Sequence, residues 1–315
     1  MDREDIYIIS RNSNWSTKNV DATLKQDVYN DASAWKKFLR LFLLILAIGF
    51  VTSGILFFFS YNWYGMNKFL KIGIIELIII IATGIALFAR VSLLVKNMLL
   101  TAVSVLVGAL FAVYGQIYQS GATVYDFFLA WTVFVTIWVV ITNYAALWAF
   151  FLYLVNATFT FYVQLETSRV SEHQAFLIVI LMNGTWLLLF LFLSKKYDYF
   201  KIASWLKNSV FVGIVAVSAF SVWEGIIEKF EPILYALVTC TTVIYFLGLK
   251  YAFANKNLIF LSIIPFSFIF ILTAFSMKAF PREWVFLING IFVMISVGYL
   301  IKYLLLIQKS EKWQS

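Results

Sequence analysis

Five polar residues in the first half of the chain are candidates for a binding site in an otherwise apolar sequence. Glu76 falls within an apolar run, while Gln116, Tyr118, Gln119 and Asp126 lie around the end of the next run. An ionised group at the centre of a membrane costs about 2.5–3.5 kcal/mol on insertion scales, so it indicates a function or a polar partner. Glutamine amides both donate and accept hydrogen bonds. We therefore expect these five residues to form one polar cluster that binds an ion or a substrate.

Two interpretations of Glu76 stay open. On a helical wheel Glu76 shares a face with Gly73, Thr83 and Gly84, and small residues allow close helix packing, which favours a face inside a bundle. Alternatively, Glu76 lies near the membrane surface, where it reaches water or pairs with Lys71.

Helix breaks are a second candidate feature. Asn183 and Gly184 fall midway through one apolar run and Pro265 midway through another. Discontinuous helices near the bilayer midplane build the substrate sites of many transporters. A membrane proline or asparagine is also an ordinary packing residue, and we favour packing for these positions and for Asn156 and Asn289.

The sequence contains few residues that could bind a metal, carry out redox reactions or form a catalytic triad. Cys240 is the only cysteine and His173 the only histidine, so an intramolecular disulfide cannot form. His173 follows Glu172 in a polar stretch, which predicts a solvated loop histidine. No constellation of nucleophile, base and metal ligands is visible, so we expect no enzymatic activity, no metal and no cofactor.

The composition is that of a membrane protein. Hydrophobic residues make up 63% of the chain and charged residues only 13%, against roughly half and a quarter in soluble domains. The net charge of +8 comes from basic residues at the ends of apolar runs, which anchor membrane helices. There is no basic stripe interleaved with aromatics, so we expect a lipid bilayer as partner and no nucleic acid.

The apolar runs predict an all-α integral membrane bundle of about ten transmembrane helices, since about 20 apolar residues cross a hydrocarbon core. The expected spans are 39–61, 69–89, 97–118, 125–142, 144–164, 174–194, 208–224, 231–249, 257–275 and 284–306. At Asn143 two spans meet either in a tight turn or as a re-entrant pair. We divide the chain into an N-terminal segment 1–38, a bundle 39–306 and a tail 307–315.

Both ends of the chain are expected on one membrane side. Val20, Leu24 and Val28 recur at helical spacing, which predicts a short amphipathic helix over residues 16–37 with Ser16 as its N-cap. Most Lys and Arg residues flank the spans on the side of the termini. The other side has only Lys68, Lys71, Arg169, Lys229, Lys278 and Arg282. Positive residues favour the inside, which predicts cytoplasmic termini.

Residues 99–163 resemble a known family. The runs GQIYQSGA at 115–122 and YDFFLAW at 125–131, followed by AALW at 145–148 and LVN at 154–156, are similar to the signature of the bacterial predicted membrane proteins called domain of unknown function 2157. Members often carry an acid where this chain has Thr123, which leaves Asp126 as the only acid of the segment. The resemblance implies a multi-pass protein of the bacterial inner membrane and implies no activity.

Three functions compete on this sequence. A transporter for a small molecule or lipid suits halves 39–164 and 174–306, because five helices in each make an inverted repeat. Against this, the Gln-rich segment has no counterpart in the second half. An accessory or scaffold subunit that binds a membrane protein partner is the alternative, and a membrane enzyme is the least favoured.

Overall fold

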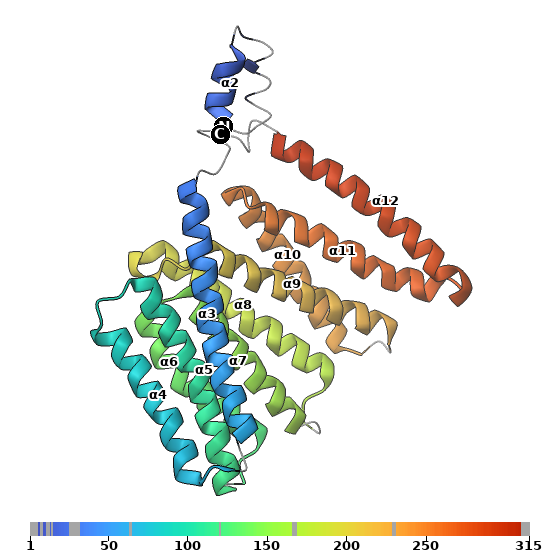
Figure 1. The fold of residues 1–315 in the computed structure, drawn as a ribbon. Coiled ribbons are helices and arrows are strands. Elements are labelled where there is room, and N and C mark those ends of the chain that lie inside the picture. The colour runs from blue at the N-terminus through green and yellow to red at the C-terminus, as the bar shows by residue number, and fades with distance from the viewer. Residues whose placement is uncertain are drawn as a thin grey trace. The chain divides into compact units, whose positions relative to one another are not determined.

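The computed structural model describes residues 6, 9–10, 13, 15–24, 32–62, 65–119, 121–165, 169–228 and 231–309. All regular secondary structure in these residues is helical (Figure 1). Ten of the helices are long and apolar enough to cross a membrane. The predicted all-α class and the predicted number of spans are therefore confirmed.

The helices follow the predicted spans closely, most of them with an extra turn at one end. Their bounds are α2 (Thr17–Thr23), α3 (Ala32–Asn62), α4 (Lys68–Phe88), α5 (Leu93–Tyr118), α6 (Val124–Thr142), α7 (Ala145–Leu165), α8 (Glu172–Lys196), η3 (Asp198–Phe200), α9 (Ser204–Ile227), α10 (Ile233–Asn255), α11 (Leu258–Ala279) and α12 (Arg282–Lys309).

The predicted N-terminal helix lies only partly within the described residues. The Ser16 side chain accepts a hydrogen bond from the Asn19 amide, which confirms the N-cap. Of the predicted range 16–37, the described residues show α2 over Thr17–Thr23 and the first residues of α3, which begins at Ala32. Residues 25–31, which include Val28 of the expected apolar face, lie outside the described residues.

Capping side chains set where several spans begin. The side chains of Asn67, Ser92, Thr123, Ser171 and Asn257 each accept a hydrogen bond from a backbone N–H in the first turn. Such a bond satisfies one of the N–H groups that have no partner within the helix. The polar breaks between apolar runs therefore fix helix starts as well as separating the spans.

The junction at Asn143 is a tight turn and not a re-entrant break. Asn143 adopts a left-handed conformation, with φ of 46°, and only Tyr144 separates it from α7. The Asn143 side chain accepts from the Trp148 indole at 3.1 Å and donates to the Tyr199 carbonyl. The Tyr199 hydroxyl donates to the Ile141 carbonyl at 2.7 Å. Tyr144, the residue between Asn143 and α7, is half-buried in this turn, and its burial raises the pKa of its phenol.

The helices form two compact units, Met1–Ser120 and Gly121–Ser315. In the first unit, α5 packs on both α3 and α4. One apolar cluster there joins Ile72, Ile75 and Ile79 with Leu110, Val113 and Ile117. These units do not coincide with the two halves of the expected repeat, and the repeat stays a prediction.

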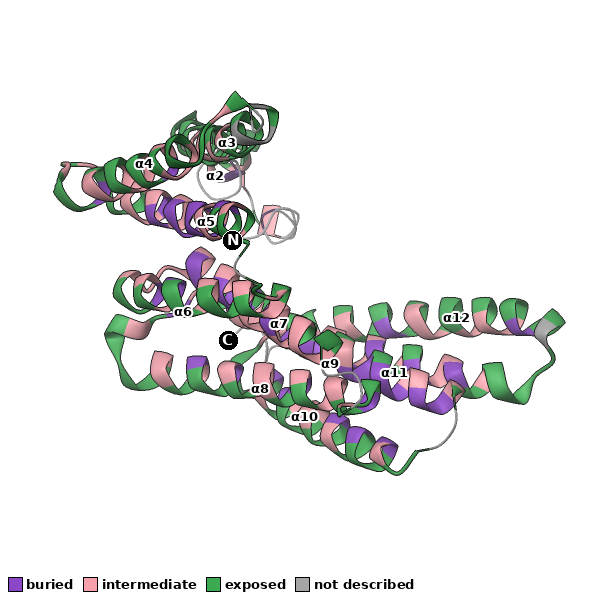
Figure 2. Cartoon of the chain, turned by 90° about the horizontal axis from the view of Figure 1, so that it is seen from below, coloured by how far each residue is buried: buried purple, intermediate pink, exposed green. Residues whose placement is uncertain are grey.

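In the second unit, α9 is the central helix and packs on α7, α8, α10 and α11. Half of its span is buried, whereas only 11% of the α12 span is. Figure 2 shows the difference as purple and green ribbon. The exposed apolar side chains of α12, such as Phe286 and Met294, contact the lipid bilayer.

Candidate functional site

An open groove of about 500 Å³ lies along α7, α8 and α9 in the second unit. Most of its lining is aliphatic, and its polar or small residues are Tyr153, Asn156, Asn183, Ser209 and Gly213. Asn156 is near the middle of α7 and Asn183 near the middle of α8, so the groove lies at mid-membrane depth. A groove of this size and polarity can accommodate a small amphiphilic molecule.

Large aromatic side chains line the contact between α7 and α8 at one end of the groove. The Trp148 ring lies 5.8 Å from that of Trp186 and 5.2 Å from that of Phe190, and Phe151 lies 5.4 Å from Trp186. Because rings of this size fill the space between the two helices, smaller side chains at mid-span leave the groove open.

A reciprocal amide pair connects α7 and α8 inside the groove. The Asn156 amide donates to Asn183 Oδ1 at 3.1 Å, and the Asn183 amide donates to Asn156 Oδ1 at 2.7 Å. The second N–H of each amide goes to a carbonyl of its own helix, at Leu152 and Val179. Each Oδ1 therefore keeps one acceptor position, which can receive a hydroxyl or ammonium donor from a ligand.

The helices are continuous at the positions considered for breaks. α8 passes through Asn183 and Gly184, and α11 passes through Pro265. The interpretation of Asn183 and Asn156 as interhelical packing residues fits the amide pair. Asn289 behaves similarly, because the Ser276 hydroxyl of α11 donates to it across the contact with α12.

Glu76, Gln116 and Tyr118 lie on the first unit as exposed side chains. Ile75, which precedes Glu76, belongs to the same apolar cluster as Val113 and Ile117 on either side of Gln116. Glu76 and Gln116 therefore lie at a similar level along α4 and α5. On the face expected to point inward, Gly73 and Glu76 are exposed, whereas Thr83 and Gly84 are half-buried.

Gln119 and Asp126 have local structural roles. Gln119 ends α5 in a left-handed conformation, with φ of 42°. Asp126 Oδ2 accepts from the Thr123 amide at 2.8 Å and from the Thr123 hydroxyl at 2.9 Å, which completes a capping box at the start of α6. Asp126 belongs to the second unit, and a cluster of all five residues stays a prediction.

His173 and Glu224 are residues whose setting the sequence interpretation missed. His173 is the second residue of α8 and is 7% exposed, so it is not a solvated loop histidine. Its Nε2 atom and Glu224 Oε2 are both buried without a hydrogen-bond partner among the described residues. The available sequence signal for Glu224 was its position, because an acidic residue just inside the end of an apolar run is unusual.

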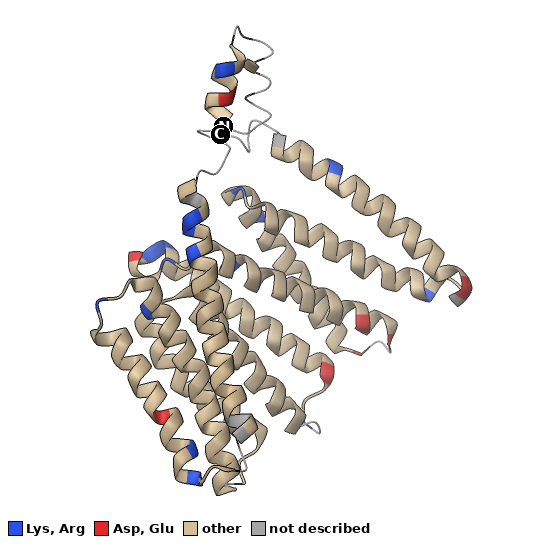
Figure 3. Ribbon diagram, viewed as in Figure 1, with Lys and Arg blue, Asp and Glu red and all other residues tan. Residues whose placement is uncertain are grey.

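The two ends of the second unit differ in charge (Figure 3). The end where α8 and α10 begin carries Glu172, Glu224, Glu228, Glu231 and Glu283. The opposite end carries the lysines 195, 196, 201, 207, 250, 256 and 302. Positive residues concentrate on the cytoplasmic side of membrane proteins, so the acidic end corresponds to the predicted outer side.

Comparison with known families matches residues 18–148 to the model described as Predicted membrane protein (DUF2157). This confirms the resemblance over residues 99–148, extends it towards the N-terminus and leaves residues 149–163 outside the matched range. The match covers the first unit from residue 18 on, together with α6 and the start of α7. No curated protein and no solved structure matches the chain.

Proposed function

We propose that this multi-pass membrane protein, which carries the DUF2157 region, is a transporter or permease for an amphiphilic small molecule or a lipid. The observation that carries the proposal is the open α7–α9 groove, because its walls are apolar and its polar pair lies at mid-membrane depth. The chain of an amphiphile would lie along aliphatic residues such as Leu152 and Val217. A donor group of the same molecule would bind the remaining acceptor positions of Asn156 and Asn183.

The predicted cluster is a second part of this proposal. Glu76, Gln116, Tyr118 and Gln119 of the first unit would bind the coupling ion or the substrate near the outer side, and the contribution of Asp126, at the start of α6, stays a prediction. The charge distribution supports a bacterial inner-membrane orientation with both termini in the cytoplasm. Glu76→Gln is then expected to abolish transport in proteoliposomes while leaving insertion intact, and retained transport would remove Glu76 from the mechanism.

Native mass spectrometry of protein extracted from its own membranes in mild detergent tests the groove. A retained lipid or small molecule in the wild type is expected, and Gly213→Leu should lose it because the new side chain fills the groove. Gly298→Leu in α12 is the matched control, since both glycines have open space at the Cβ position. Equal retention in both variants would contradict the groove as the site. A stoichiometric protein partner without a ligand would support the accessory-subunit alternative.

A further inference from the structure

A buried histidine lies where α8 begins and α9 ends. The Nδ1 atom of His173 lies 4.0 Å from Glu231 Oε2, at the start of the segment that leads into α10. On its other side, the imidazole packs against Gly225, where an added Cβ would be 3.5 Å from Nε2. Glutamate is the residue before Gly225 in α9, so the ring lies between elements that carry acids on both sides.

The local structure explains why the ring is buried. Ser171 and Gln174 form a capping box that fixes the first turn of α8, and His173 lies within that turn. A side chain at position 225 would also meet Leu234 Cδ1 at 2.6 Å. The glycine therefore lets both the imidazole and the start of α10 approach the α9 backbone.

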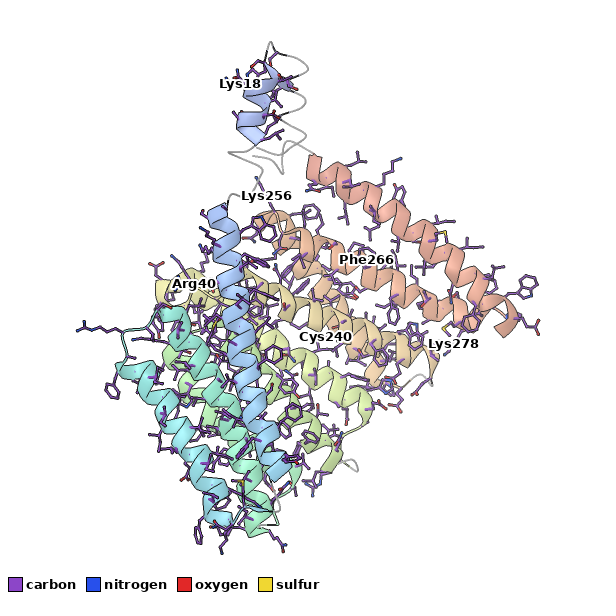
Figure 4. All side chains as sticks on the ribbon, in the orientation of Figure 1. Lys18, Arg40, Cys240, Lys256, Phe266 and Lys278 are labelled. Atoms are coloured by element: carbon purple, nitrogen blue, oxygen red, sulfur yellow. The ribbon has the colours of Figure 1, made fainter. Side chains whose placement is uncertain are left out.

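The charges around the ring are predominantly negative. Glu172, Glu228 and His173 are near enough to Glu224 to act on it electrostatically. Lys278 at the end of α11 (Figure 4) is a basic side chain in this region, and its Nζ donates to the Glu228 carbonyl at 3.2 Å. Among the described residues, the titratable and charged groups on the elements around the site are Arg169, Glu172, His173, Glu224, Glu228, Glu231 and Lys278.

We propose that His173 and Glu224 form a proton-binding site at this end of the second unit, with Glu231 as the partner of the protonated ring. With the neutral ring carrying its hydrogen on Nδ1 toward Glu231, the buried Nε2 has a free lone pair. A proton taken from water binds there, and the imidazolium then lies between carboxylates that compensate its charge. An imidazole nitrogen and a carboxylate oxygen are both proton acceptors, so a proton is the ligand that these two buried atoms fit.

The site is independent of the transport proposal, because it depends on neither the groove nor Glu76. The positive N-terminal end of the α8 helix dipole disfavours a cation at His173. The acidic residues of α8, α9 and the segment that leads into α10 favour a cation there. Proton binding at His173 therefore depends on those acids, and this dependence can be measured.

Nuclear magnetic resonance on the full chain in nanodiscs gives the test. His173 is the only histidine, so histidine-labelled protein purified through a histidine-free tag shows one imidazole signal. Titrated from about pH 5 to about pH 8, the midpoint should move to lower pH in Glu224→Gln and in Glu231→Gln, with proton binding weakened at least about threefold. Glu283→Gln removes an exposed acid at the start of α12 and should leave the midpoint unchanged.

Two results would overturn the proposal. One is a midpoint that is the same in the wild type and in both acid variants. The other needs no variant: above the midpoint, nitrogen shifts of the wild-type ring should show the hydrogen on Nδ1, and a ring with its hydrogen on Nε2 would exclude the arrangement. Loss of the copurified ligand in the groove variant changes neither measurement, so the two proposals fail separately.

Discussion

The middle of α8 and the beginning of α8 differ in how their polar side chains are hydrogen-bonded. At Asn183 both N–H groups are bonded, one across to Asn156 and one to a carbonyl of the same helix. At His173 one ring nitrogen has no hydrogen-bond partner in the part of the chain that the structure describes, and neither does Glu224 Oε2 on the neighbouring helix. The amide pair has all its N–H groups bonded, so it holds two helices together and keeps only acceptor positions, whereas the titratable pair keeps one unbonded atom on each partner.

The largest difference is expected from breaking the satisfied pair. Asn183→Leu leaves the Asn156 amide with an unmade hydrogen bond in an apolar groove, and should lower the free energy of unfolding by about 1–2 kcal/mol. The double variant Asn156→Leu/Asn183→Leu should cost less than the sum of the two single changes, because no amide is left unpaired. Unfolding by detergent titration measures all three, and strict additivity would show that the pair does not act as a unit.

A smaller effect is expected where the imidazole meets α9. Gly225→Ala places a methyl group against Leu234 and His173, so it should lower stability by about 1 kcal/mol and move the imidazole signal. Gly213→Ala is made in the same helix with open space around the new atom. There the better helix propensity should raise stability by up to about 1 kcal/mol. If both substitutions changed the stability in the same direction, the contact at Gly225 would not constrain the imidazole ring.

The cap of α8 offers a comparison with the cap of α6. Ser171→Ala removes one hydrogen bond from the first turn and should cost about 1 kcal/mol, while also shifting the His173 signal. Thr123→Ala removes the equivalent bond in the capping box of Asp126, together with the bond from the Thr123 hydroxyl to Asp126 Oδ2, far along the chain from the histidine. Thermal unfolding together with the imidazole spectrum separates them, since only the first change should affect both.

The smallest change in stability is expected at Glu224 itself. Because Oε2 makes no hydrogen bond, Glu224→Gln should alter the free energy of unfolding by no more than about 0.5 kcal/mol. This value contrasts with the Asn183 variant, although both residues are half-buried. A loss as large as that of Asn183→Leu would indicate a structural role for the carboxylate and weaken the contrast between the two regions.

Hydropathy was sufficient for the number of spans and for most helix ends, because about 20 apolar residues leave few alternatives in a bilayer. The turn at Asn143 was also visible, as a single polar residue between two runs. The amide pair had a signal as well, since Asn156 and Asn183 are similarly distant from the loop that joins α7 and α8.

The setting of His173 had no local signal. Its burial depends on Gly225 and Leu234, which approach it only after α8, α9 and α10 have packed. Asp126 shows the opposite case, because its partner Thr123 lies three residues away and the capping pattern is in the sequence. The structure shows this capping role, and the ligand role of Asp126 stays a prediction.

The tight turn at Asn143 has a consequence for biosynthesis. The link between α6 and α7 has two residues and spans only about 7 Å. The end of α6 and the start of α7 therefore stay on the same side of the membrane while the chain is being inserted. The two segments must therefore enter the bilayer together as a helical hairpin. The bond between Asn143 and Trp148 can form within this hairpin, whereas the bond of Asn143 to Tyr199 is completed only after α8 and η3 have followed.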